Sequence, residues 1–189
     1  GGAVVHNAGL WQIVANNNLV NAGGSNLFVN TGTLIKNGGS SSASIGWSLN
    51  TLGTVNTPAG SGSFSFSDLT GNNVFQGAAR LSFPTMRAAL TVASNAVLDW
   101  TDGDLVGALT VAPGGFTSIS NSVTFGYNNG VQNGGGTLTN FGTVIWAGST
   151  HYGYGGAILH NAGLWQLVVN NNLVNAGGTN LFVNTGTLE

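Results

Sequence analysis

The sequence predicts an all-β chain folded as a right-handed parallel β-helix, a β-solenoid, with about 22 residues per coil and seven coils in each repeat of 154 residues. Three observations predict it: a long internal duplication, a shorter glycine-marked beat, and short apolar segments separated by clusters of Gly, Asn and Ser. A repeat this faithful indicates a stacked structural module, and such modules are more often built for length than for catalysis.

The duplication sets the long period. Residues 1–34 return as residues 155–188 with five differences, all between chemically similar side chains: Val4/Ile158, Val5/Leu159, Ile13/Leu167, Ala15/Val169 and Ser25/Thr179. We therefore interpret residues 1–189 as one continuous segment of a longer solenoid array. Residues 1–154 form one full repeat and residues 155–189 begin the next, and we interpret both ends of the chain as cuts that leave targeting information out.

A shorter beat divides this period. It is marked by Asn-x-Gly followed by alternating apolar residues, and its glycines are Gly9, Gly32, Gly142, Gly163 and Gly186, with a looser form at Gly53. The long gap between Gly53 and Gly142 divides into four steps, with intermediate positions expected at Gly77, Ala96 and Gly114 or Gly115. Seven coils of about 22 residues then complete the repeat.

Each coil is expected to consist of short strands and turns. The apolar segments alternate or run continuously over a few residues, and no segment shows a convincing 3.6-residue period with helix caps. The clearest, in chain order, are Leu10–Val14, Leu27–Val29, Phe64–Phe66, Ala96–Trp100 and Thr143–Trp146. Coils stacked at the spacing of neighbouring strands, about 4.8 Å, make one repeat about 34 Å long.

Stacking assigns a role to the asparagines and to the apolar residues behind them. An amide carries donors and an acceptor that can pair with the amides of the coils above and below, so we expect an asparagine ladder at Asn7, Asn30, Asn50, Asn140, Asn161 and Asn184. The glycine that follows supplies φ > 0 or a close backbone approach. Two residues after the glycine, one inward apolar column is expected at Trp11, Leu34, Val55, Leu98, Val144 and Trp165.

Composition excludes several classes of partner. Charged residues make up 4% of the chain, against roughly a quarter in an ordinary soluble domain, and the net charge of −2 gives no hold on nucleic acid or anionic lipid. No cysteine is present to form a disulfide or a thiolate metal site. No apolar run is long enough for a membrane-spanning helix, so membrane insertion is not expected.

Arg80 and Asp99 fall at equivalent positions of adjacent coils, where we expect an ion pair.

Two segments carry a family likeness, residues 30–39 (NTGTLIKNGG) and residues 98–107 (LDWTDGDLVG). They resemble repeats of very large bacterial surface and secreted proteins, the parallel β-helix shafts of autotransporter passengers and filamentous-haemagglutinin-like adhesins. The resemblance implies a stalk or fibre that holds other domains away from the cell, and an extracellular location on the bacterial surface.

Two clusters are the candidates for chemistry or binding. Asp99, Asp102 and Asp104 form the only group of carboxylates, interpreted mainly as a turn, with Asp102 and Asp104 as a weak Ca²⁺ candidate and no other cofactor expected. Residues 151–156 read as a protruding loop in which His151, Tyr152 and Tyr154 form a possible surface for a glycan or a neighbouring fibre.

Three functional hypotheses follow. The preferred one is a structural, non-catalytic segment of an extracellular fibre, stalk or filament, whose partners are further copies of the same repeat. The second is a glycan-binding adhesin that uses the 151–156 loop. The third is a polysaccharide-active β-helix enzyme, which requires Asp99, Asp102 and Asp104 to face one groove.

Overall fold

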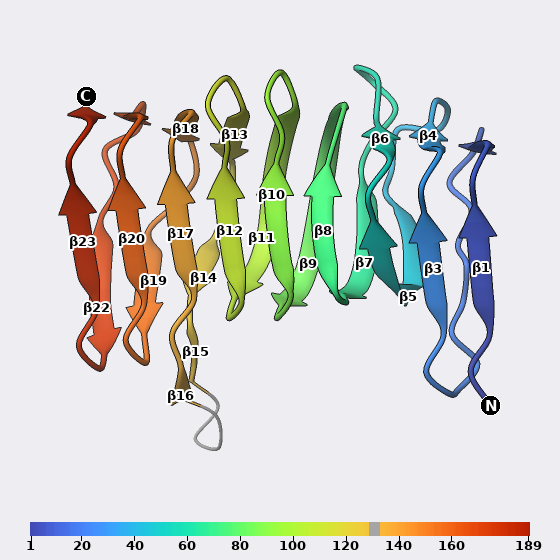
Figure 1. Ribbon diagram of the computed structural model, residues 1–189, viewed down its shortest axis with the longest axis horizontal. Helices are drawn as coiled ribbons and strands as arrows, with labels where there is room; N and C mark the ends of the chain where they lie inside the picture. Colours follow the sequence, from blue (N-terminus) through green and yellow to red (C-terminus); the bar gives the residue numbers. More distant parts are fainter. Residues whose placement is uncertain (129–132) are drawn as a thin grey trace.

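The chain is a stack of β-coils. The computed structural model describes residues 1–128 and 133–189, and within that part of the chain every regular element is a strand. Figure 1 shows the strands side by side along the long axis, with the two termini at opposite ends. The predicted all-β solenoid is confirmed, and no helix that could cross a membrane occurs among the described residues.

Each coil presents three faces, which meet at corners. The first face is formed by β1 (Val4–Asn7), β3 (Leu27–Asn30), the end of β5 (Ala43–Thr51), β8 (Asn72–Phe75), β10 (Ala89–Val92), β12 (Ala108–Val111), β17 (Thr137–Asn140), β20 (Ile158–Asn161) and β23 (Leu181–Asn184).

The second face follows each first-face strand after a short turn. It is formed by β2 (Leu10–Ile13), β4 (Thr33–Lys36), β6 (Thr54–Asn56), the start of β9 (Ala78–Met86), the start of β11 (Val97–Leu105), β13 (Phe116–Ile119), β18 (Thr143–Trp146), β21 (Leu164–Leu167) and β24 (Thr187–Leu188).

The third face closes the coil. It is formed by the starts of β5 and β7 (Phe64–Leu69), by the ends of β9 and β11, and by β14 (Val123–Phe125), β19 (His151–Tyr154) and β22 (Leu173–Gly177). The end of β7 pairs with the end of β5 on the first face. The nine-residue strands β5, β9 and β11 run around a corner and so belong to two faces; β11 does this with register shifts around Asp102.

All pairings between coils are parallel, and seven coils separate β2 from its repeat equivalent β21. The coils differ in length, because Ala89 pairs with Asn72, Val97 with Phe116, and Ala108 with Thr137, offsets of 17, 19 and 29 residues. The expected 22 residues per coil is thus an average. The solenoid tolerates this variation because extra residues enter turns and leave the stacked strands in register.

The positions predicted from the short glycine-marked repeat accept backbone hydrogen bonds from the next coil at one corner. Val97 N donates to Gly77 O (2.8 Å), Phe116 N to Ala96 O (2.9 Å) and Thr143 N to Gly115 O (2.9 Å). The intermediate positions expected at Gly77 and Ala96 are confirmed, and Gly115, not Gly114, makes the bond to the next coil.

Close approach is the reason for glycine at this corner. A Cβ on Gly32 would collide with the Gly9 carbonyl oxygen of the coil below, and a Cβ on Gly163 would collide with that of Gly142. A side chain at these positions would force adjacent coils apart.

The expected inward positions from Leu34 to Trp165 are buried, but they form two aligned runs and not one column. The strand register aligns Trp11, Leu34 and Val55 in successive coils, and the pairing of Thr54 with Gln76 then places Gly77 beside Val55. The second run is Ala79, Leu98, Thr117, Val144, Trp165 and Leu188, in which the Thr117 hydroxyl has no hydrogen-bond partner among the described residues. Trp11 departs from the expectation: it is 38% exposed, because it lies in the first coil with no coil beneath it.

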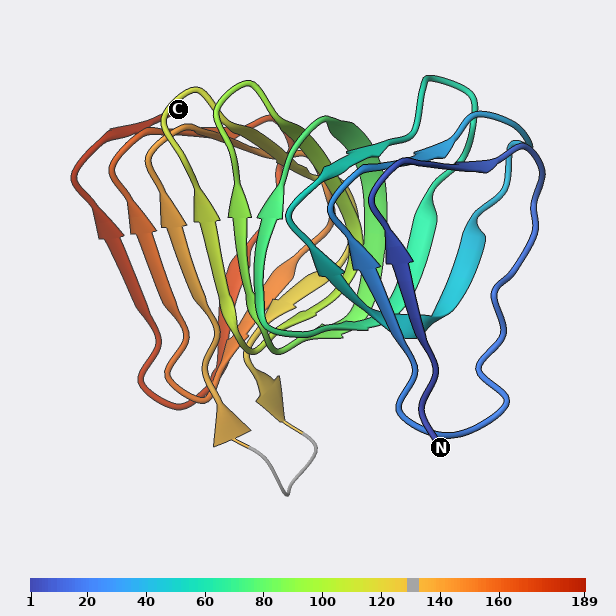
Figure 2. The same cartoon turned by 45° about the vertical axis from the view of Figure 1, so that its right-hand side comes forward.

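The protruding excursion lies elsewhere than predicted. In Figure 2 an antiparallel hairpin, β15 (Tyr127–Asn128) and β16 (Asn133–Gly134), extends below the stack between the third face of one coil and the first face of the next. Residues 151–156 were expected to protrude, but His151–Tyr154 form β19, which pairs with β14 and β22. The extra length of this part of the repeat lies between β14 and β17, where β15 and β16 are found.

Candidate functional site

Two buried polar columns, which we call the asparagine ladders, run inside the corner between the first and second faces. In the first ladder Asn7 Nδ2 donates to Asn30 Oδ1 (2.8 Å), and Asn30 Nδ2 donates to Thr51 Oγ1 (3.1 Å). The second ladder is formed by Asn140, Asn161 and Asn184, with Nδ2 to Oδ1 distances of 2.8 and 2.7 Å.

Four of the five ladder amides, those of Asn7, Asn30, Asn140 and Asn161, also bond the backbone of the next coil. The second Nδ2 hydrogen reaches a carbonyl oxygen of the following coil, such as Thr33 O from Asn7 (2.9 Å) or Leu164 O from Asn140 (2.8 Å). Both donors of these amides therefore join one coil to the next without burying a formal charge.

The ladder prediction needs two corrections. The strand register places Thr51, not Asn50, above Asn30, and Asn50 instead donates to Thr70 O (2.8 Å) from a half-exposed position. The signal was in the sequence, because each true ladder residue lies two positions before its glycine, as Thr51 does before Gly53. Between the two ladders the same position is occupied by buried apolar side chains: Phe75, Val92 and Val111.

A matched pair of variants distinguishes the ladder from a surface amide. Asn30→Ala removes bonds to two coils, because one Nδ2 hydrogen of Asn7 loses its acceptor while Thr51 Oγ1 and Thr54 O each lose a donor, so we expect a loss of about 2 kcal/mol in the free energy of unfolding. Asn50→Ala, one coil away, should cost less than about 1 kcal/mol. Chemical denaturation followed by tryptophan fluorescence measures both, and equal losses would contradict the corrected register.

His151 faces the interior, not a ligand surface. Its ring lies 4.2 Å from the Trp146 ring and 5.8 Å from the Phe125 ring, centroid to centroid, and the side chain is fully buried. Nδ1 lies 3.0 Å from the Val123 carbonyl oxygen and 3.1 Å from the Val123 amide nitrogen, while Nε2 has no partner among the described residues. Burial lowers the pKa of His151 to about 4, against the opposing effect of the hydrogen bond that Nδ1–H can donate to the Val123 carbonyl, so the ring is neutral near pH 7.

Tyr152 and Tyr154 are the parts of the predicted surface that do reach the outside. They alternate with the buried His151 and Gly153 along β19, because successive side chains of a strand point to opposite faces. Their rings are stacked, with centroids 6.5 Å apart and planes 30° apart. The pair forms a small aromatic platform on the third face.

The three acidic residues are divided by a corner of β11. Asp99 lies on the second face, where its Oδ2 accepts from Arg80 Nε (2.9 Å) and its Oδ1 accepts from Ser120 Oγ (2.5 Å). The expected ion pair with Arg80 is confirmed. A hollow of about 470 Å³ beside Arg80 and Asp99 is lined on one side by residues 57–60 and Gly62, and neither Asp102 nor Asp104 lines it.

Asp102 and Asp104 lie beyond the corner, on either side of Gly103. Partial burial raises the pKa of Asp104, and the neighbouring Asp102 charge adds to this, whereas the hydrogen bond to Thr124 and the Arg87 charge oppose it. Gly103 has φ of 117°, and this left-handed conformation bends the strand. Among the described residues no group of three acidic or histidine side chains is arranged to hold a metal ion.

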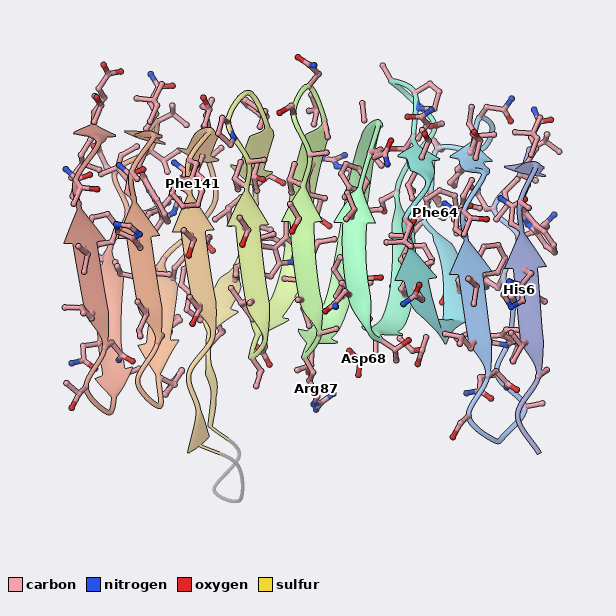
Figure 3. All side chains as sticks on the ribbon, viewed as in Figure 1. His6, Phe64, Asp68, Arg87 and Phe141 are labelled. Carbon is pink, nitrogen blue, oxygen red and sulfur yellow. The ribbon has the colours of Figure 1, made fainter. Side chains whose placement is uncertain are left out.

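A second ion pair joins neighbouring coils in the same part of the rod. Arg87 Nη1 lies 3.3 Å from Asp68 Oδ2, and Figure 3 shows both side chains at the lower edge of the stack. Both pairs are exposed, and exposed pairs contribute about 0–1 kcal/mol each. Formal charge is thus concentrated in the coils that carry no asparagine ladder.

Lys36 is a residue whose role the sequence did not indicate. It is fully buried at the end of β4, and its ammonium donates to the carbonyl oxygens of Gly38 (2.5 Å), Gly39 (2.7 Å) and Ser61. Three donors meet three acceptors, so the charge is solvated by backbone. Lys36 ties the turn after β4 to the turn of the next coil.

The stacked parallel coils and the asparagine ladders inside them define the class of this protein as a parallel β-solenoid with amide ladders. No protein-family model, no curated protein and no solved structure matches this chain.

Proposed function

We propose that the chain is a structural, non-catalytic repeat segment of an extracellular fibre, stalk or filament on a bacterial surface. The observation that carries the proposal is the regular stacking of coils that resumes after 154 residues. The near-copy of the first coil stacks through β20 on β17 and through β21 on β18, in unbroken register. A module that repeats by stacking on itself extends a rod.

The interior supports a mechanical role. Asparagine ladders, the inward apolar residues and parallel backbone bonds each connect one coil to the next, so every coil adds length and stiffness together. The extracellular location rests on the resemblance of residues 30–39 and 98–107 to bacterial surface repeats.

A second candidate function is glycan binding by an adhesin. It is favoured by one observation, the stacked and outward-facing pair of Tyr152 and Tyr154 on an otherwise regular face. Aromatic rings held rigidly on a sheet suit the apolar face of a sugar ring.

Protease resistance and surface labelling test the proposal. We expect the purified chain to resist a broad-specificity protease, because among the described residues most segments are held in stacked strands by hydrogen bonds between coils, and Lys36 is buried. Antibodies raised against it should label the intact cells that produce the protein. Labelling that requires permeabilised cells, or rapid digestion into small peptides, would contradict the proposal.

A glycan array run with the same preparation separates the two candidates. Binding that is lost in Tyr152→Ala and Tyr154→Ala, but kept in Phe141→Ala, would favour the adhesin. Phe141 is a suitable control because it is also an exposed aromatic residue.

A further inference from the structure

The second face carries a hollow in the middle of the rod, several coils from either end of the chain. Its volume of about 470 Å³ is within the range of about 300–1,000 Å³ that is typical of small-molecule sites. A second hollow of about 290 Å³ adjoins it, and Arg80 lines both. We call the two hollows together the Arg80 groove.

The groove arises from unequal connections between the second and third faces of successive coils. Residues 57–63 connect β6 to β7, and residues 120–122 connect β13 to β14. The two coils between them have no connection at this corner, because β9 and β11 run around it as single strands. The groove therefore lies over β9 and β11, and the connection after β6, which rises from the top of the stack in Figure 1, forms one wall.

Buried hydrogen bonds hold this wall in place. The Lys36 ammonium donates to Gly39 O (2.7 Å), in the connection of the preceding coil, and to Ser61 O, in the wall itself. Ser61 also donates to Pro58 O through its amide nitrogen (3.0 Å) and its hydroxyl (2.5 Å). A wall that is already ordered loses little conformational entropy when a ligand binds, and this favours affinity.

The floor of the groove presents both hydrogen-bond donors and acceptors. Arg80 Nε is held by Asp99 Oδ2 (2.9 Å), whereas Arg80 Nη1 and Nη2 have no hydrogen-bond partner among the described residues. The Arg80 side chain is 54% exposed, so these N–H groups are open to a ligand. The Asp99 carboxylate accepts from Arg80 and Ser120 and keeps further lone pairs, and Asn121 adds an exposed amide.

Apolar surface and a balanced charge complete the groove. Ala78 and Val97 are neighbours on adjacent coils of the floor, and both are exposed, as is Pro58 on the wall. Among the described residues that line the two hollows, Arg80 and Asp99 are the only charged ones, and their charges cancel. An anion would therefore gain little net attraction, whereas a ligand with neighbouring hydroxyl groups and an apolar ring face finds partners for both.

We propose that the Arg80 groove is a binding site for a neutral saccharide. Adjacent sugar hydroxyls accept from the free Arg80 N–H groups and donate to Asp99, while the C–H face of the sugar ring packs on Ala78 and Val97. Asp99 is the one carboxylate among the described lining residues, and cleavage of a glycosidic bond generally uses two, so the site binds without cleaving. The inference goes beyond the proposed structural function and does not rest on it.

An array of neutral oligosaccharides tests the proposal. The array carries oligomers of glucose, galactose, mannose and N-acetylglucosamine, with polygalacturonate and heparin as acidic probes, and the best neutral binder is then titrated by calorimetry. We expect one site per chain, in the Arg80 groove, that binds a neutral oligosaccharide and leaves the acidic probes unbound.

A matched pair of substitutions locates the site. Arg80→Gln and Arg87→Gln each remove one positive charge from an exposed ion pair, with arginine side chains 54% and 51% exposed, but only Arg80 lines the groove. We expect Arg80→Gln to weaken binding by about ten- to a hundredfold, because hydrogen bonds to a charged group are lost. Arg87→Gln should bind like the unmodified protein.

Ala78→Trp tests the floor independently. The indole fills the groove and leaves the Arg80–Asp99 pair in place, so we expect binding to be lost. Because Ala78 is exposed, the circular dichroism spectrum of this variant should match that of the unmodified protein.

Four results would overturn the inference. The first is no binding of any neutral probe at concentrations up to about 10 mM, and the second is equal affinity of the Arg80→Gln variant and the unmodified protein. Binding of the acidic probes alone would reject a neutral ligand. Binding that is lost in Tyr152→Ala but kept in Arg80→Gln would assign the saccharide to the aromatic pair on β19. The structural function is tested separately, by protease resistance and surface labelling.

Discussion

Lys36→Met is expected to destabilise the chain by about 4 kcal/mol, the largest effect of any single substitution considered. Methionine keeps the length of the side chain but removes the ammonium, leaving the carbonyl oxygens of Gly38, Gly39 and Ser61 without their buried donor. Each buried acceptor left unpaired costs about 1–3 kcal/mol. Urea denaturation, followed by circular dichroism, measures the loss.

Arg87→Met is the control for this substitution. It also removes one positive charge, but from an exposed side chain that contacts Asp68 at 3.3 Å, so the expected loss is less than about 1 kcal/mol. Similar losses for the two variants would show that net charge, not the buried hydrogen bonds of Lys36, determines the stability.

The second large effect is a loss of stability in acid that depends on His151. Burial lowers its pKa from 6.5 to about 4, so the unfolded chain binds a proton between these values and the folded chain does not. Stability is therefore complete above pH 6.5 and falls as the pH drops toward 4, by about 3 kcal/mol in all. Denaturation midpoints measured at intervals between pH 7 and pH 4 reveal the slope.

His151→Phe should remove this contribution to the slope while keeping an aromatic ring against Trp146 and Phe125. Its absolute stability will differ, because the Val123 backbone loses its bond to Nδ1. His6→Ala, at an exposed position, should keep the wild-type pH dependence. An unchanged slope in His151→Phe would mean that other groups, such as the carboxylates, cause the acid sensitivity.

The features of the fold that could be predicted are those that recur from one stacked coil to the next. The glycine positions, the inward apolar residues and most ladder residues recur once per coil, and recurrence at one spacing is visible in the sequence. The Arg80–Asp99 pair was predictable for the same reason, since it follows from counting three residues past two equivalent corners.

One ladder residue was misplaced although its spacing was visible: the position two residues before the glycine is Thr51, whereas residue type pointed to Asn50, and a one-residue shift within a strand reverses the direction of every side chain. Other features had no recurring signal. The inward direction of His151 depends on the same alternation, and aromatic composition alone suggested a surface. Lys36 donates to backbone carbonyls, one of them 25 residues away. Every residue has a backbone carbonyl, so the pattern of side chains in the sequence does not show which ones Lys36 binds.

The sequence by itself determined that this chain is a β-solenoid, where its coils turn, and that its period is seven coils. A backbone conformation that repeats in every coil requires similar residue types at the same positions, so the sequence spacing of those residues predicts the architecture. Tertiary structure alone decided which polar side chains are buried, which coils are long or short, and which of the acidic and aromatic residues share a face. Those outcomes depend on strand register and on contacts between coils, because a single residue of shift exchanges the interior for the surface.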